Sequence, residues 1–103
     1  MTHHFHLQHE EHGGASAMRL DGELDIAAAD QFRRMVSDLM GAGVRVVTVD
    51  LEGAEFVDST GLGALLWAEH RLRAAGGDLI VLHARGPVKR TFVLAGLGSL
   101  LAH

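Results

Sequence analysis

The stretch that decides the fold is Phe56-Val-Asp-Ser-Thr-Gly-Leu-Gly-Ala-Leu-Leu66. A β-branched apolar run, residues 44–51, precedes it and predicts a buried strand. A helical pattern follows it and continues to about residue 75. We therefore expect Asp58, Ser59 and Thr60 at the turn into a helix, where a side-chain oxygen of any of them can accept a hydrogen bond from the first amides.

Two glycines, Gly61 and Gly63, follow these capping candidates and leave the backbone open to close approach. A helix N-terminus also carries partial positive charge, which favours an anion nearby. The stretch thus predicts a small exposed hydroxyl with room for a phosphate group.

Length and composition narrow the class of protein. A chain of 103 residues predicts a single domain over 1–103. The net charge of -4 argues against direct nucleic-acid binding. The chain has no cysteine, which excludes disulfides and thiolate chemistry. The apolar runs are too short for membrane insertion and the polar, His-rich start is unlike a signal peptide, so we expect a cytoplasmic protein.

Alternation over residues 3–10 and 15–23 predicts two strands joined by a turn at Gly13-Gly14, with a further turn over 21–25. Asp25 can cap a helix that begins near Ala27. Its apolar face has helical spacing and comprises Phe32, Met35, Val36 and Leu39.

The second half of the chain repeats the strand-helix pattern. Residues 52–55 are expected to form a loop, and 79–82 a buried strand. Gly86-Pro87 opens a third helix whose apolar stripe is Val88, Phe92 and Val93. The order β-β-α-β-α-β-α predicts an α/β fold: a mixed sheet of four strands, or five if the tail 99–102 adds one, with helices packed on it.

Residue chemistry gives little support for an enzyme, so we expect no catalytic residue and no cofactor. His70 lies about three turns along the same helix from Ser59 and cannot act as its general base. The Gly-x-Ser-x-Gly turn and the phosphate-loop lysine are both absent. The N-terminal histidines at 3, 4, 6, 9 and 12 lack an identifiable partner, so no metal site is expected.

Two roles for residues 58–60 stay open at this point. The three side chains can simply cap the helix. Alternatively, phosphorylation of Ser59 would add a charge of roughly -1.5 to -2 beside Asp58 and obstruct a closely packed partner without unfolding the chain.

Three segments together resemble the STAS domain family, and within it the bacterial anti-sigma factor antagonists. The first is Gly22-Glu-Leu-Asp25. The second combines Val49-Asp-Leu51 with Phe56-Val-Asp-Ser-Thr-Gly-Leu-Gly63. The third combines Gly86-Pro-Val-Lys-Arg90 with Leu94-Ala-Gly-Leu97. The similarity spans nearly the whole chain, which implies a single STAS domain.

The resemblance implies a partner switch. The unphosphorylated protein would bind an anti-sigma factor that is also a serine kinase, and so release the sigma factor. The kinase would phosphorylate Ser59, and a PP2C-type phosphatase would restore the active form. The implied partner-binding residues are Glu23, Leu24, Asp25, Asp58, Thr60, Gly61, Leu62 and Gly63.

The family also includes an alternative role. Some single-domain STAS proteins are constitutive subunits of membrane transport complexes, such as lipid-trafficking ABC systems, or belong to stressosome-like assemblies. The closing helix of longer antagonists has no counterpart after residue 102. An edge left uncovered there predicts self-association into a homo-oligomer.

Overall fold

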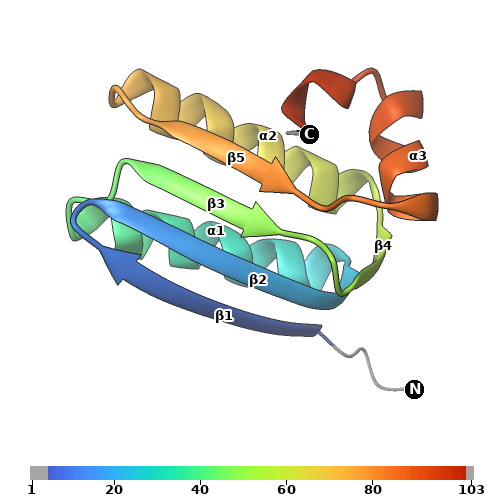
Figure 1. Ribbon diagram of the computed structural model, residues 1–103, viewed down its shortest axis with the longest axis horizontal. Helices are drawn as coiled ribbons and strands as arrows, with labels where there is room; N and C mark the ends of the chain where they lie inside the picture. The colour runs from blue at the N-terminus through green and yellow to red at the C-terminus, as the bar shows by residue number, and fades with distance from the viewer. Residues whose placement is uncertain (1–4, 102–103) are drawn as a thin grey trace.

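The computed structural model describes residues 5–101, with the side chains of Glu10 and 13–101. The first two strands form the antiparallel edge of the sheet (Figure 1). β1 (Phe5–His12) pairs with β2 (Ala15–Leu24) from Phe5↔Gly22 to His12↔Ala15. The predicted turn at Gly13-Gly14 is confirmed, and both glycines have positive φ. His3 and His4 lie outside the described residues.

The remaining strands are parallel to β2. β3 (Val46–Asp50) lies between β2 and β5 (Asp78–Leu82), and the order across the sheet is β1-β2-β3-β5. β4 (Ala54–Val57) also pairs with β2, beyond the end of β3. The predicted α/β fold with a mixed sheet is confirmed, and β4 makes it five-stranded.

Two long helices cover one face of this sheet (Figure 1). α1 (Ile26–Gly41) begins at the predicted cap, Asp25, whose carboxylate accepts the Ala28 amide at 3.1 Å. α2 (Ser59–Ala74) packs beside α1. Their apolar faces meet β2, β3 and β5 in one core, which includes Phe32, Leu65 and Leu72. No helix within residues 5–101 is long and apolar enough to cross a membrane.

Two local predictions in the first half of the chain are wrong. The expected turn over 21–25 is mostly strand, because β2 continues to Leu24 through a bulge at Gly22, whose φ is +92°. The expected loop over 52–55 is half strand: β4 has too few residues, and too many exposed ones, to show a periodic pattern. The Gly22 amide donates to the Gly53 carbonyl at 2.9 Å, which holds the two segments together.

The end of the chain also differs from expectation. α3 (Gly86–Leu94) starts with proline in its first turn as predicted, but Val93 is 56% exposed and does not belong to the buried stripe. The tail forms a 3₁₀ turn, η1 (Gly98–Leu100), and Leu101 makes a single parallel bridge to Val81. The described part of the tail is therefore not a full strand.

Candidate functional site

The predicted site lies at the carboxyl edge of the parallel strands, where β2 leads into α1 and β4 leads into α2 (Figure 1). The Asp58 amide approaches the Leu24 carbonyl oxygen at 3.4 Å. Because β2 and β4 are neighbours in the sheet, the segment 22–25 and the segment 58–63 lie side by side. The structure thus brings together the two segments that the sequence singled out.

Asp58 is the N-cap of α2. Its Oδ1 accepts the Gly61 amide at 2.9 Å and the Thr60 hydroxyl at 2.5 Å. Partial burial of the carboxyl opposes ionisation, but these hydrogen bonds outweigh it and hold the pKa of Asp58 below its ordinary value. Asp58 is therefore a carboxylate at neutral pH.

Ser59 takes no part in this cap. It is the first residue of α2, its side chain is exposed, and its hydroxyl makes no hydrogen bond with any residue in 5–101. The capping role thus falls to Asp58, supported by Thr60. The Ser59 hydroxyl is left facing solvent at a helix N-terminus, a geometry that a kinase can reach and that tolerates an anion.

The two glycines of the site have different surroundings. A Cβ added at Gly61 would lie 2.4 Å from the Leu24 carbonyl oxygen and 2.7 Å from Leu24 Cγ, whereas one at Gly63 would meet nothing within 4 Å. Gly61 is required because α2 packs directly on the end of β2. Gly63 is exposed and leaves the helix backbone open to a partner.

The predicted partner-binding residues divide by exposure. Leu24, Gly61 and Leu62 are buried, so they support the surface from beneath and are not exposed on it. The remaining predicted residues are exposed or partly exposed: Glu23, Asp25, Asp58, Thr60 and Gly63.

Sequence reasoning missed two apolar side chains beside the site. Ile26, directly after the α1 cap, is 71% exposed, and Phe56, two residues before the α2 cap, is 50% exposed. Phe56 is the register partner of Glu23 on β2. The sequence feature that could have identified them is their position, because each is a large apolar residue next to a helix cap at the same edge of the sheet. Single exposed apolar side chains are common on protein surfaces, so it is their place beside the predicted site that makes these two candidates for partner contact.

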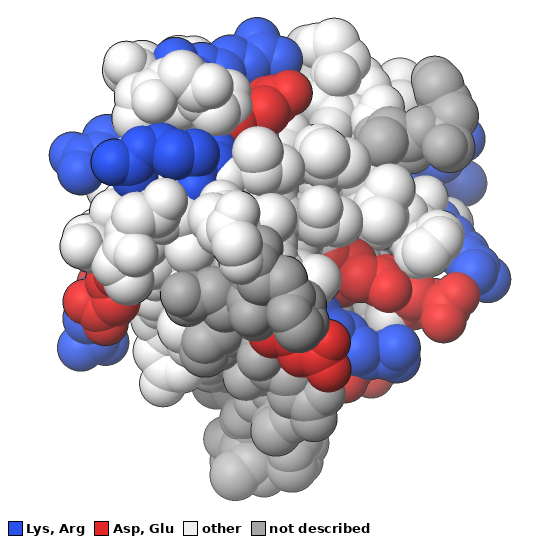
Figure 2. Space-filling model, turned by 60° about the vertical axis from the view of Figure 1, so that its left-hand side comes forward, with Lys and Arg blue, Asp and Glu red and all other residues white. Residues whose placement is uncertain are grey.

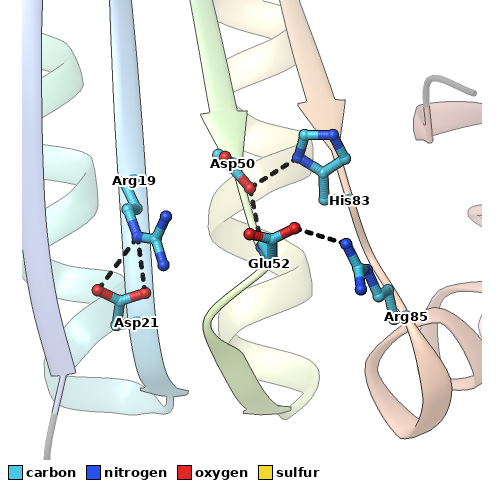
Figure 3. Close-up of polar contacts among 6 residues, drawn as sticks. All are labelled: Arg19, Asp21, Asp50, Glu52, His83 and Arg85. Carbon is cyan, nitrogen blue, oxygen red and sulfur yellow. Dashed lines mark hydrogen bonds and ion pairs between the residues drawn. The ribbon is translucent and has the colours of Figure 1, made fainter.

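A second polar group lies farther along the same edge, at the ends of β3 and β5 (Figure 3). His83 Nδ1 lies 3.0 Å from Asp50 Oδ1, and Arg85 donates to Glu52 at 2.5 Å. Burial raises the pKa of Asp50, but the Glu52 amide and His83 lower it more, so it stays below its ordinary value. These pairs join residues 33 positions apart and depend on the β3–β5 register.

The opposite end of the molecule carries charges of both signs. Figure 2 shows basic side chains interspersed with acidic ones on this face. Near the start of β5, Arg73 pairs with Asp78 at 3.1 Å and with Glu69 at 3.4 Å. No three His, Asp or Glu side chains among the described residues form a group that could hold a metal ion.

Comparison with known proteins agrees with this geometry. The sequence model of the STAS domain family matches residues 6–102 of this chain. The anti-sigma F factor antagonist of Lysinibacillus sphaericus is 37% identical over 82 residues, which cover 79% of this chain and 70% of that protein. The anti-sigma F factor antagonist of Paenibacillus polymyxa is 28% identical over 92% of this chain and 82% of its own length.

Solved structures give the same result. The anti-sigma factor antagonist SpoIIAA in its unphosphorylated form superposes with a TM-score of 0.85 and 30% identity, over 94% of this chain and 86% of that one. The phosphorylated form of SpoIIAA, a Bacillus cell fate determinant, gives a TM-score of 0.77 and 29% identity, over 94% and 89% of the two chains. The chain therefore belongs to the STAS domain family.

Proposed function

We propose that this protein is an anti-sigma factor antagonist that is controlled by phosphorylation of Ser59. In its unphosphorylated form it binds an anti-sigma factor that is also a serine kinase, and a PP2C-type phosphatase reverses the modification. The observation that carries the proposal is the exposed Ser59 hydroxyl, unengaged by residues 5–101, beside the ionised Asp58 cap. The names of the relatives, and the two phosphorylation forms in which SpoIIAA was solved, support it.

The surface around Ser59 suits a partner that closes over it. Phe56 and Ile26 offer apolar contact area, and the bare backbone at Gly63 permits close packing. A neutral hydroxyl at the centre of such an interface costs little to desolvate. A phosphate dianion beside Asp58 costs several kcal/mol unless it is paired, and it also occupies the space of the partner.

The fold itself is expected to survive the modification. The hydrogen bonds that start α2 are made by Asp58 and Thr60, so a phosphate on Ser59 breaks none of them. The amino end of α2 also partly offsets the added charge. The chain needs no cofactor and performs no catalysis in this scheme, because the kinase brings ATP and Mg²⁺.

The first test is intact-mass and peptide analysis of the protein from its native host, with and without phosphatase treatment. We expect a phosphate on Ser59 that phosphatase removes. Absence of the modification under both growth and stress would contradict the proposal and favour a constitutive subunit.

Variants at Ser59 separate the charge from the loss of the hydroxyl. Ser59→Ala should capture the kinase partner from host lysate and not be released by ATP. Ser59→Asp should weaken capture about tenfold or more, while Ser59→Asn, which has the same shape without charge, should retain it. Equal capture by Ser59→Asp and Ser59→Asn would refute the electrostatic switch.

A further inference from the structure

A cavity of about 380 Å³ lies between the end of β5, α3 and the C-terminal tail. This volume is within the range of small-molecule binding sites, which combine an apolar lining with few polar groups. The polar groups of its wall are His83, Arg85 and Lys89, and the apolar ones are Ala84, Val93 and Leu101.

The charge of the wall comes mainly from Lys89. His83 and Arg85 each already contact a carboxylate, Asp50 and Glu52 respectively (Figure 3). The Lys89 ammonium makes no hydrogen bond or ion pair with any of the residues 5–101, and the residue is exposed. One uncompensated ammonium on the wall favours a ligand with a single negative charge.

The apolar part of the wall lies one helical turn further along α3. Val93 is four residues after Lys89, so both project from the same side of the helix. Val93 is 56% exposed, and across the cavity Leu101 is held in place by its bridge to Val81. An alkyl chain placed between Val93 and Leu101 would remove both from water.

We propose that this cavity binds a small amphiphilic monoanion, namely a carboxylate on a short unbranched alkyl chain. The carboxylate pairs with Lys89, and the chain lies against Val93 and Leu101. The site is distinct from Ser59, but α3 packs on β4, the strand that leads into Asp58. The ligand would therefore bind on an element that supports the partner-binding surface.

The proposal is tested by calorimetric titration of the full chain with butyrate, hexanoate and octanoate. Each added methylene should tighten binding about fourfold until the cavity is full. Hexylamine, which has the same chain and the opposite charge, should not bind. Inorganic phosphate, an anion without a chain, should bind more weakly than octanoate.

Neighbouring residues on α3 supply matched controls. Lys89→Gln should weaken binding of all three carboxylates about tenfold, and Arg90→Gln, which removes a charge outside the cavity wall, should not. Val93→Ser should weaken octanoate more than butyrate, and Leu94→Ser should change neither. All four positions are exposed, so circular dichroism should show an unchanged fold.

The proposal would be overturned by no binding at millimolar concentration, by an affinity independent of chain length, or by an equal loss of affinity in Lys89→Gln and Arg90→Gln. Binding of phosphate as tight as that of octanoate would identify a plain anion site instead.

Discussion

Replacing Gly61 by alanine tests the packing of α2 on the end of β2, which joins the two segments of the proposed partner-binding surface, 22–25 and 58–63. The new Cβ would lie 2.4 Å from the Leu24 carbonyl oxygen, a backbone atom that cannot rotate away. Overpacking of this kind costs about 3 kcal/mol at the upper end. Alanine in place of a helical glycine returns about 1 kcal/mol. We therefore expect Gly61→Ala to lower the free energy of unfolding by about 2 kcal/mol.

Gly63→Ala is the matched control, because it makes the same change two residues along the same helix. A Cβ there meets nothing within 4 Å, so only the helix propensity remains, and stability should rise by about 1 kcal/mol. Thermal denaturation followed by circular dichroism measures both variants. At roughly 5 °C per kcal/mol, the two melting temperatures should differ by about 15 °C. Equal stability of the two variants would refute the close packing of α2 on β2.

Three further predictions concern stability. Ser16→Ala should stabilise the protein by about 1 kcal/mol, because the Ser16 hydroxyl is buried without a partner in the described chain; destabilisation in urea titrations would indicate a hidden partner. The lowered pKa of Asp58 means that its ionised form stabilises the fold. This contribution is complete above the ordinary value of 3.8 and is lost as pH falls through the lower folded value, so Asp58→Asn should flatten the decline of stability below pH 3.8; a slope equal to that of the wild type would contradict this. Gly77→Ala should cost about 3 kcal/mol or more, because its Cβ would meet the Arg45 carbonyl oxygen; a wild-type melting temperature would exclude that contact.

The parts of the fold that local chemistry determines could be predicted from the sequence. Asp25 caps α1, a residue of the segment 58–60 caps α2, and Pro87 lies in the first turn of α3, as the neighbouring residues in the sequence imply. The buried strand β3 is predictable because its apolar run, residues 44–51, is long. Each of these signals lies within one element and does not depend on what packs against it.

The features that escaped prediction depend on pairing across the sheet. β4 is a strand because the end of β2 is beside it, and its four residues show no periodic pattern. The contact between His83 and Asp50 follows from the β3–β5 register. Val93 has the spacing of a buried residue, but nothing in the described chain covers that side of α3. The choice of Asp58 over Ser59 and Thr60 as the cap of α2 likewise depends on the three-dimensional structure, because all three side chains can accept the amide hydrogen bond.

The way in which the start of α2 is anchored determines whether the chain must refold when Ser59 is modified. Two contacts hold residues 58–61 in place: the hydrogen bond of the Asp58 carboxylate to the Gly61 amide, and the packing of Gly61 on the Leu24 backbone. Ser59 takes part in neither contact. Adding or removing a group at Ser59 thus involves no refolding step. Under the proposed control, the duration of the signal would be set by the turnover of the kinase and the phosphatase, and a cell could lengthen or shorten it by changing the amounts of these two enzymes.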